Sequence, residues 1–523
     1  MDFDLNEHQL QFVNGMISHI RNGEFGCYCL EAPAGTGKSF SCKTLSFNFS
    51  KNFKCESKKC GCNQGSFIIA PTHKAKNVLV KSGNYKATTI HRFLRATHDY
   101  DMYGNLIFSY APVPLRNHLI FIDECSMVGD DHYKIFIENY SKDNWIVFCG
   151  DSLQLPPIKL SDPQSLLDDC EIEEESLTTG ESTLSKTFST ANRYTLTKNM
   201  RTLDPLSAIT LSNARNSIEN GKLPETIITT GIPDVLNRFR SSDPSKTIVL
   251  AYTNSRVNSY NLIIRTELFL NDPTEVLKQF YLDELLVFTG FRKIETTVYN
   301  TSDIIKVTKL EQETIYIQHF KCNCMKLKAT KKCFDCGISG KHTDGYDIEF
   351  WKITDDNDII WYIPYGELDK RNFAKIKKHY KKFCITVKKS LEWHIYFDFI
   401  NLYDANLKYS YSSTVHKAQG SEWNTVFVDR SNICFSVKDD TSLKLRAYYT
   451  AISRMKENVY ELSYNSHTVN EIVTTTLNCG KYEGHSFDYV LKHDSGYCKW
   501  VLKQEIKTGL LKPFYTWLCL RNL

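Results

Sequence analysis

The chain has 523 residues, of which 42% are hydrophobic and 24% charged, and its formal net charge is +4. This composition excludes a collagen-like, low-complexity or wholly disordered chain, and no apolar run reaches the ~18 residues of a membrane-spanning helix. The first residues are acidic and polar, so we expect no secretory signal and an intracellular, soluble protein. The eighteen cysteines are then expected to be reduced thiols or metal ligands rather than disulfides.

Short apolar runs in the first part of the chain end in polar or glycine-rich loops. They cover residues 27–30, 67–70, 119–122 and 145–149. Runs of this length are typical of buried parallel strands, which place ligands at their carboxyl ends. We therefore predict an α/β lobe over residues 1–195. Within it, residues 96–117 are expected to form a hairpin that turns at Tyr103-Gly104-Asn105.

A second set of apolar runs covers residues 247–251, 425–428 and 459–462. It predicts a second α/β lobe built from residues 196–265 and 406–470. The segment between them, 266–405, is rich in Tyr, Phe, Ile, Val and Thr, which is typical of a mostly β subdomain. The expected fold is thus two parallel-sheet α/β lobes in tandem with small inserted β subdomains, and residues 471–523 stay unassigned.

The first predicted strand leads into a phosphate-binding loop, Glu31-Ala32-Pro33-Ala34-Gly35-Thr36-Gly37-Lys38-Ser39, and then into a helix-like stretch. Backbone N–H groups from Gly35 to Ser39 can wrap a β-phosphate at the start of that helix. Lys38 would reach the β- and γ-phosphates, and Ser39 would hold Mg²⁺. Ala32 departs from the usual pattern, which has glycine at that position.

Polar side chains also follow the other predicted strands. Asp123 and Glu124 follow the strand at 119–122, where Asp123 would bind Mg²⁺ and Glu124 would polarise the attacking water. The strand at 145–149 leads into residues 150–157, where Gln154 would contact the γ-phosphate; a simple turn is the alternative there. Together these sites predict the binding and hydrolysis of Mg²⁺-ATP.

With these sites the chain resembles superfamily 1 helicases, in the branch called 1B that contains RecD-like and Dda-like enzymes. Motif-like runs carry the resemblance over about residues 5–460, namely 5–9, 70–75, 89–93, 123–127, 150–157, 199–201, 414–422 and 449–454. The fold that this resemblance implies has two RecA-like motor lobes, with an SH3-like β insert at 266–405. It implies adenine recognition by Gln9 and a nucleotide contact at Glu422. It also implies that Arg201 and Arg454, both expected in the second lobe, face the γ-phosphate.

The resemblance further implies an ATP-dependent helicase that moves 5′→3′ on single-stranded DNA and unwinds duplex. Gln419 supports this polarity, because the 3′→5′ branch usually has lysine there. The residues that match nucleic-acid motifs are Pro71, Thr72, His73, Thr89, His91, Phe93, Thr414 and His416. Met200 stands where relatives often carry an aromatic residue. A superfamily 1 RNA helicase, or a nucleotide-switched clamp that does not unwind, are the alternatives.

The expected partners are single-stranded and forked DNA, with replication or repair proteins as further candidates, and a monomer is favoured. The hairpin at 96–117 is either an ordinary surface hairpin or a pin in which Phe108 or Tyr110 separates the strands. The high use of Lys, Asn, Tyr, Phe and Ile is typical of an AT-rich genome, such as a viral one.

Two groups of cysteines have spacings that suit metal binding. Cys322, Cys324, Cys333 and Cys336 form two close pairs around a short basic loop, which predicts a structural zinc site; four reduced thiols are the alternative. Cys55, Cys60 and Cys62 lack an obvious fourth ligand, and a plain basic loop is favoured there.

A strongly basic stretch extends from Lys370 to Lys389, with nine Lys or Arg and no Asp or Glu. Phe373, Tyr380 and Phe383 lie among these cations. Aromatic and cationic side chains together suit single-strand binding, whereas a solvated amphipathic helix or strand is an equal alternative.

Overall fold

The computed structural model describes residues 4–52, 65–81, 83, 86–156, 185–201, 203–226, 228–270, 277–290, 292–294, 297–299, 301, 303–318, 345–437, 440–462, 477, 481–482, 490, 493–503 and 514. Both cysteine groups with predicted metal spacing lie outside these residues: Cys55, Cys60 and Cys62, and Cys322, Cys324, Cys333 and Cys336. Within the described ranges, no helix has the length and apolar character needed to cross a bilayer.

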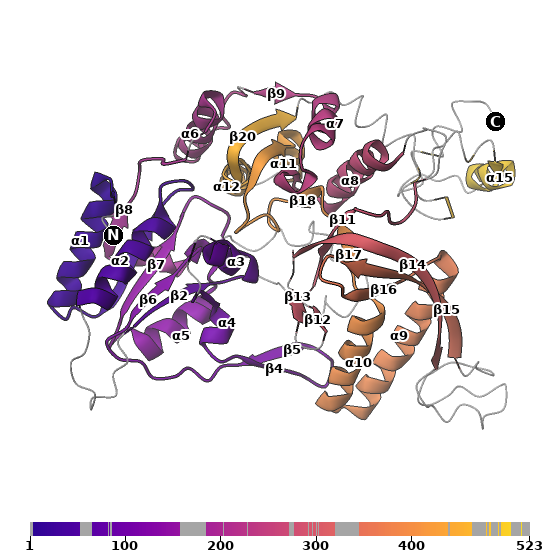
Figure 1. Cartoon of the computed structure of the whole chain (residues 1–523), viewed down its shortest axis with the longest axis horizontal. Helices are drawn as coiled ribbons and strands as arrows, with labels where there is room; N and C mark the ends of the chain where they lie inside the picture. The colour runs from indigo at the N-terminus through magenta and orange to yellow at the C-terminus, as the bar shows by residue number, and fades with distance from the viewer. Residues whose placement is uncertain are drawn as a thin grey trace.

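A six-stranded parallel sheet forms the first lobe (Figure 1). In spatial order its strands are β3 (Thr88–Thr89), β2 (Ser66–Ala70), β6 (Leu119–Ile122), β7 (Trp145–Gly150), β1 (Gly26–Glu31) and β8 (Asn192–Thr195). Because both sides of the strands are apolar, helices cover both faces. The helices α1 (Glu7–Arg21) and α2 (Lys38–Asn52) pack on one face, and α4 (Ile90–Phe93) and α5 (Asp130–Tyr140) on the other. The helix α3 (His73–Lys81) follows β2.

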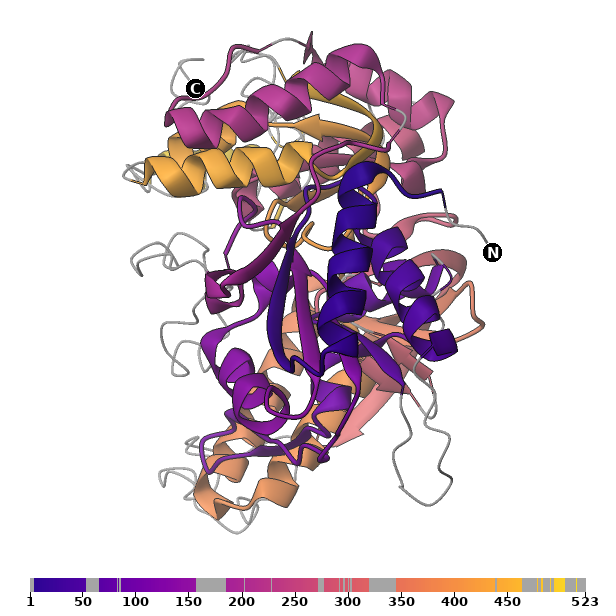
Figure 2. The ribbon, with the colours of Figure 1, turned by 90° about the vertical axis from the view of Figure 1, so that its left-hand side faces the viewer.

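A five-stranded parallel sheet forms the second lobe, which lies above the first in Figure 2. Its strands in order are β18 (Ser412–Thr414), β10 (Thr247–Ala251), β19 (Trp423–Val428), β20 (Met455–Leu462) and β9 (Thr229–Thr230). One face is covered by α6 (Pro205–Asn220), α11 (Arg430–Ser436) and α12 (Thr441–Ile452). The other is covered by α7 (Ile232–Ser241) and α8 (Asn254–Phe269). The two parallel sheets confirm the predicted fold class, and all seven predicted strands are present.

The insert between β10 and β18 contains a five-stranded antiparallel sheet. Its order is β16 (Ile360–Pro364), β15 (Gly345–Asp355), β14 (Ile304–Gln318), β11 (Leu285–Phe288) and β17 (Leu407–Tyr409), and β12 (Arg292–Ile294) pairs with β13 (Thr297–Tyr299). Two long helices, α9 (Glu367–Val387) and α10 (Ser390–Tyr403), lie side by side next to this sheet (Figure 1). The expectation of a mostly β insert did not include this helix pair.

The basic stretch at 370–389 is therefore mostly helical, and its aromatic residues are not free to stack on bases. Phe373 and Tyr380 are buried, with 1% and 4% of their surface exposed, and Phe383 packs against the same core. Of the two equal alternatives for this stretch, the structure favours the amphipathic helix, because Phe373 and Tyr380 hold α9 against α10 and the sheet. Beyond the second lobe, the described part of the C-terminal segment contains α15 (Ser495–Lys503).

Candidate functional site

The phosphate-binding loop connects β1 to α2, and two of its glycines are required by its conformation. Gly35 and Gly37 both have a φ of +83°, which side chains disfavour. A Cβ on Gly35 would lie 2.6 Å from Asn199 Oδ1, and one on Gly37 would lie 2.3 Å from Gln9 Nε2. Ala32, the departure from the usual pattern, is buried, and its N–H donates to Gly150 O at 2.7 Å. Alanine is therefore accommodated at that position.

A largely buried cluster of three charges lies where the terminal phosphates would bind. Lys38 Nζ lies 2.7 Å from Asp123 Oδ1 and 3.2 Å from Glu124 Oε1. Burial alone would lower the pKa of Lys38, but the two carboxylates outweigh it and raise the pKa well above its ordinary value. Burial raises the pKa of Asp123. The lysine is thus a fixed cation at this strand edge.

The backbone at Glu124 is strained in a way that aims its side chain. Its φ of +49° and ψ of +43° are left-handed, which disfavours an L side chain by roughly 1–2 kcal/mol. Asp123 Oδ1 accepts the Glu124 N–H at 3.0 Å and supports the turn. Strain of this kind at a non-glycine residue is typical of functional sites. Here it turns the carboxylate from the end of β6 toward Lys38.

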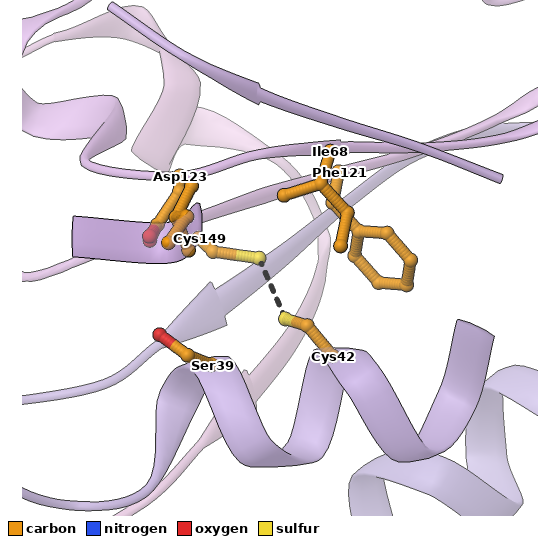
Figure 3. A pocket seen from close by; sticks show the side chains of 7 residues that line it. Ser39, Cys42, Ile68, Phe121, Asp123 and Cys149 are labelled. Carbon is orange, nitrogen blue, oxygen red and sulfur yellow. Dashed lines mark hydrogen bonds between the residues drawn. The ribbon is translucent and has the colours of Figure 1, made fainter. Parts of the chain in front are cut away.

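Oxygen ligands for Mg²⁺ converge beside this cluster. Ser39, at the start of α2, and Asp123, at the end of β6, line the same small pocket, together with the thiols of Cys42 and Cys149, whose sulfur atoms are 3.5 Å apart (Figure 3). Mg²⁺ in nucleotide sites takes one or two protein oxygens and completes its shell with phosphates and water. One hydroxyl and one carboxylate fit this requirement.

The predicted adenine end is organised by the start of α1. Gln9 is buried, its Oε1 accepts the Asn6 N–H at 3.1 Å, and its Nε2 donates to Thr36 O at 3.1 Å. Its amide is therefore fixed against the phosphate loop. Met200 is 50% exposed and its sulfur accepts a hydrogen bond from Asn6 Nδ2 at 3.4 Å. A thioether, rather than an aromatic ring, lies beside Gly37 at this end.

The two predicted arginines approach the phosphate loop from different sides. Arg201 was expected in the second lobe, but it lies in the connection between β8 and α6, where the preceding Met200 N–H donates to Gly35 O at 2.7 Å. Its guanidinium reaches the second lobe, where it pairs with Glu422 and donates to Met455 O at 2.7 Å. Arg201 is therefore anchored on both lobes, because its backbone contacts one and its side chain the other.

Arg454 comes from the second lobe, directly after α12, and is 3% exposed. Its Nε donates to Thr450 O at 3.2 Å. Burial tends to raise the pKa of Glu124, but Lys38, Arg454 and Arg201 together lower it. Both arginines thus act electrostatically on the carboxylate that contacts Lys38, so charged groups of both lobes lie near one another, and we call this junction the nucleotide crevice.

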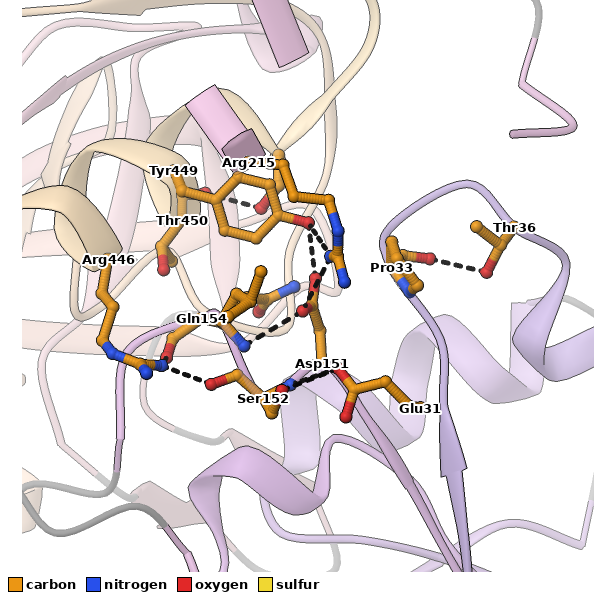
Figure 4. Close-up of polar contacts among 12 residues, drawn as sticks. Glu31, Pro33, Thr36, Asp151, Ser152, Gln154, Arg215, Arg446, Tyr449 and Thr450 are labelled. Atoms are coloured by element: carbon orange, nitrogen blue, oxygen red, sulfur yellow. Dashed lines mark hydrogen bonds and ion pairs between the residues drawn. The ribbon is translucent and has the colours of Figure 1, made fainter. Parts of the chain in front are cut away.

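A buried hydrogen-bond network connects the lobes beside this crevice (Figure 4). Asp151, at the end of β7, is 2% exposed and accepts from Tyr449 Oη of α12 at 2.6 Å and from Arg215 Nη1 of α6 at 3.2 Å. Arg215 also donates to Tyr449 Oη at 3.1 Å. A satisfied network in a low dielectric is strong and directional. Asp151 therefore links the first lobe to two helices of the second.

Main-chain groups after Asp151 extend the same connection. Leu155 N–H donates to Thr450 Oγ1 at 2.9 Å, and Gln419 Nε2 donates to Leu155 O at 3.0 Å. Arg446 Nη1 donates to Gln154 O at 3.4 Å and to Ser152 O. Gln154, predicted to sense the γ-phosphate, is buried in this segment. The loop after β7 thus contacts both lobes.

The predicted nucleic-acid residues of the two lobes face each other at a second junction. Thr72, which follows Pro71 at the start of α3, caps that helix, and its Oγ1 lies 3.6 Å from where a Cβ on Gly420 would be. Gly420 has a φ of +71° and makes this close approach possible. Lys74 Nζ donates to Lys417 O at 3.5 Å and lies 5.0 Å from the centre of the Trp423 ring.

Two histidines at this junction have buried ring atoms without partners. Among the described residues, His73 Nδ1 and His416 Nδ1 make no hydrogen bond. Burial lowers the pKa of both, that of His416 to about 4, so each ring is neutral near pH 7. Buried polar atoms normally find a partner, so these two are available to a bound ligand. Thr414 is buried and caps the turn before His416, with its Oγ1 accepting from Lys417 N–H.

The hairpin expected at 96–117 is present as β4 (Thr97–Tyr100) and β5 (Leu106–Ser109). Phe108 on β5 is 41% exposed, and its ring centre lies 4.9 Å from that of His91. Tyr110 follows the strand, and its hydroxyl is 2.9 Å from His132 Nε2 of the first lobe. Of the two candidate wedge residues, Phe108 is on the hairpin and Tyr110 is fixed at its base.

One of the predicted nucleic-acid residues near the hairpin also packs on the first lobe. Phe93 packs its ring against Phe67, Phe136 and Tyr140, with ring centres 5.2–5.9 Å apart. It is partly buried against the core of the first lobe, and its contact with nucleic acid stays a prediction. Thr89 caps α4, with its Oγ1 accepting from the Arg92 N–H at 3.3 Å, and so positions His91.

The hairpin is held by the insert. Tyr100 stacks on Phe397 of α10 with ring centres 4.5 Å apart, and Asp99 accepts from Ser390 and lies 3.2 Å from His394 Nε2. At the turn, Gly104 has a φ of +87°, and a Cβ there would lie 2.7 Å from the Trp393 ring. Figure 1 shows the hairpin reaching α10 from the first lobe.

Several residues of these contacts were not identified from the sequence. Asp151, Tyr449 and Thr450 lie in the quoted motif runs but received no role. Arg215, Arg446 and Trp393 carry no local signal, because their partners lie far away in the chain: Asp151 is 64 residues from Arg215, and Ser152 is 294 residues from Arg446.

Two family models match the chain. One, described as an AAA domain, matches residues 4–222, and the other, a UvrD-like helicase C-terminal domain, matches residues 409–460. The first therefore covers the phosphate loop, Asp123, Glu124 and Arg201. The second covers a segment of the second lobe that contains Arg454.

Two relatives match almost over their whole length. An uncharacterized protein, R530, of Acanthamoeba polyphaga mimivirus is 25% identical, and the match covers 86% of this chain and 98% of that protein. The ATP-dependent DNA helicase dda of Enterobacteria phage T4 is 22% identical, with 87% and 99% covered. A solved structure of Pif1 helicase from Bacteroides, in complex with ADP-AlF3 and single-stranded DNA, aligns at 14% identity over 96% of this chain and 98% of its own, with a TM-score of 0.42.

Proposed function

We infer that this chain, which is a superfamily 1B helicase of the Dda-like branch, hydrolyses ATP to move 5′→3′ on single-stranded DNA and to unwind duplex. The observation that carries the proposal is the shared crevice. Lys38, Asp123 and Glu124 come from one lobe, and Arg454 from the other, and Arg454 lowers the pKa of Glu124. Such a crevice would hold a triphosphate between groups of both lobes.

Each residue of the crevice has a proposed role in hydrolysis. Lys38 leaves its carboxylates for the phosphates, while Ser39 and Asp123 hold Mg²⁺, which neutralises charge on the phosphate oxygens when bound. Glu124 orients the attacking water. Phosphoryl transfer depends mainly on such positioning and charge stabilisation, so we expect Lys38→Ala to abolish hydrolysis.

We propose that the two arginines couple ATP hydrolysis to movement of the lobes. Arg201 and Arg454 stabilise the charge on the γ-phosphate, as arginine fingers do. Because Arg454 belongs to the second lobe, losing the phosphate releases an attraction between the lobes. The junction of Thr72, His73, Thr414 and His416 then changes its grip on the nucleic acid, and we propose that this alternation is translocation.

A strand-polarity assay tests the function as a whole. In single-turnover unwinding with ATP and Mg²⁺, a duplex with a 5′ single-stranded tail should open and one with a 3′ tail should not. Opening from the 3′ tail alone would reverse the polarity. ATP hydrolysis without any opening would favour the nucleotide-switched clamp.

The sugar specificity needs its own measurement, because nothing in these motifs identifies a 2′-hydroxyl contact. We expect DNA oligonucleotides to stimulate ATP hydrolysis more than RNA oligonucleotides of the same sequence. Equal or stronger stimulation by RNA would favour an RNA helicase.

We also propose that Cys322, Cys324, Cys333 and Cys336 hold a structural Zn²⁺. The four cysteines lie between β14 and β15, which pair from Gln318 and Gly345 onward, so the segment is the connection of a hairpin. Four thiolates would close a tetrahedral site. Purified protein should contain close to one zinc per chain, and Cys333→Ser with Cys336→Ser should lose it. Folded, metal-free wild-type protein would contradict this proposal.

A further inference from the structure

The helix α9 has two faces of opposite character. Its buried face carries Phe373, Ile376, Tyr380 and Cys384, which pack on α10 and the sheet of the insert. Its exposed face carries cations at the same helical spacing: Arg371, Lys375, Lys378 and Lys382. At 1.5 Å per residue these four side chains form a stripe roughly 16 Å long. We call this set the basic stripe.

Within the part of the chain that the structure describes, the charges of the basic stripe have no acidic partner. No Asp or Glu occurs between Lys370 and Lys389, and among the described residues none of the four cations forms a salt bridge. Lys375 donates to Asn372 Oδ1 at 3.2 Å and lies 5.5 Å from the centre of the Tyr346 ring, both of which are neutral groups. Like charges three or four residues apart destabilise a helix, so a row of one sign fits an anionic partner.

The basic stripe leads toward the hairpin. It continues into Lys388 and Lys389, which are exposed at the junction of α9 and α10. The next residue, Ser390, donates to Asp99 on β4. Figure 1 shows α9 and α10 side by side, with the hairpin at the end of α10. The cations therefore lead toward the hairpin, which the sequence analysis gives as a candidate pin at the fork.

We propose that the basic stripe binds the phosphate backbone of the unopened DNA duplex ahead of the hairpin. The proposal rests on the proposed function, because the hairpin marks the fork only in a helicase. Duplex DNA carries about one charge per 1.7 Å of its axis, so a stripe of this length can follow several phosphates. A single strand is a poorer fit, because Phe373 and Tyr380, two rings of this helix that could stack on bases, are buried.

Such a contact would orient the duplex relative to the hairpin. Phosphate contacts position nucleic acid without reading its sequence. The four cations lie on one rigid helix, which is packed against the same helix that holds the hairpin. The stripe therefore holds the duplex at a constant angle to Phe108 while the lobes move.

The test compares two variants that lose the same charge. The stripe variant combines Arg371→Gln, Lys375→Gln, Lys378→Gln and Lys382→Gln, changes that keep helix-forming side chains. The control variant combines Lys51→Gln, Lys142→Gln, Lys222→Gln and Lys456→Gln, which are exposed lysines of the two lobes. Binding to a short blunt duplex and to oligo-dT is measured by fluorescence anisotropy without nucleotide, over a range of salt concentrations.

The stripe variant should bind the blunt duplex at least tenfold more weakly than the control variant. The slope of its log affinity against log salt concentration should be smaller in magnitude by about 2 to 4. Each lost phosphate contact removes about 0.9 from this slope. Its affinity for oligo-dT and its DNA-stimulated ATP hydrolysis should stay within about twofold of the control, whereas fork unwinding should fall.

Three results would overturn the proposal. Unchanged duplex affinity and salt slope would mean that the stripe does not bind duplex and serves an acidic protein or solubility. Loss of oligo-dT binding alone would assign the stripe to the single strand. An equal loss of duplex affinity in both variants would show that the effect comes from net charge and not from the stripe. A wild-type protein that binds duplex through the stripe but unwinds neither tailed substrate would instead contradict the proposed function.

Discussion

The nucleotide crevice and the hairpin are held by different kinds of contact. In the crevice, opposite charges pair with one another: Lys38 contacts two carboxylates, and Arg201 pairs with Glu422. At the hairpin, rings and a few polar groups pack on a separate subdomain, as Tyr100 does on Phe397. Removing one charge leaves its partners buried and unpaired, whereas removing one ring weakens a packed surface. Changes in the crevice should therefore abolish chemistry, and changes at the hairpin should separate chemistry from unwinding.

Glu124→Gln should have the largest effect. The amide keeps the shape of the side chain but cannot accept a proton from water, so we expect ATP hydrolysis to fall by about 10² to 10⁴. Binding of a fluorescent ATP analogue should persist. Glu138→Gln on the exposed side of α5 makes the same chemical change away from the crevice and should be silent. Normal hydrolysis by Glu124→Gln would show that our assignment of the attacking-water residue is wrong.

Tyr449→Phe should have an intermediate effect, because it removes a single hydroxyl from the link between the lobes. A buried hydrogen bond to a carboxylate contributes roughly 1.5–3 kcal/mol, so DNA-stimulated hydrolysis should fall about tenfold or more. Hydrolysis without DNA should change less than twofold.

The neighbouring Tyr448 provides a matched control. Its hydroxyl donates to Glu461 at 2.7 Å within the second lobe, so Tyr448→Phe can lower stability but should leave the stimulation by DNA intact. Combining Tyr449→Phe with Asp151→Asn should add little to either change alone. Additive losses would mean that these two residues do not act together.

Phe397→Ala should impair unwinding more than hydrolysis. It removes the ring on which Tyr100 stacks, so the hairpin loses part of its support while the crevice is untouched. An aromatic pair contributes about 0.5–1.5 kcal/mol beyond its buried area, and we expect unwinding to fall several-fold with DNA-stimulated hydrolysis unchanged. Leu402→Ala, on an exposed position of the same helix, is the control. Equal losses in both assays would remove the distinction between the two regions.

The smallest effect concerns pH. Burial and Lys417 lower the pKa of His416 from 6.5 to about 4. Between these two pH values the ring is neutral in the folded protein but protonated in the unfolded chain. The stability that His416 contributes is therefore present above pH 6.5 and is lost as the pH falls toward 4. At about 1.4 kcal/mol per pH unit, the loss is at most roughly 3 kcal/mol. Urea unfolding of wild type and His416→Asn over this range measures it, and parallel curves would contradict the assignment.

The same contrast explains what could be predicted from the sequence. The strands of both lobes and the residues at their ends were predictable, because a short apolar run followed by a polar loop places Lys38, Asp123 and Glu124 at one sheet edge by local pattern alone. The helix α9 was only one of two equal alternatives, although Phe373, Ile376, Tyr380 and Cys384 recur with helical period; the surrounding cations and rings fit a single-strand site equally well.

Contacts between distant segments were beyond local patterns. The hydrogen bond of Arg215 to Tyr449 forms only because α6 lies beside α12. Trp393 approaches Gly104 only because the insert meets the first lobe. The position of Arg201 between the lobes could not be predicted either, because its motif does not indicate which lobe its backbone contacts. Phe93 shows the converse: it matches a motif, but that match does not show that its ring packs against neighbouring rings of the first lobe.

A crystal structure with Mg²⁺ and a non-hydrolysable ATP analogue tests the central claim most directly. We predict that Lys38 Nζ leaves Asp123 for the terminal phosphates, and that the guanidinium groups of Arg201 and Arg454 lie within hydrogen-bonding distance of the γ-phosphate. An analogue bound by the first lobe alone, with both arginines turned away from it, would contradict a motor whose two lobes share one nucleotide.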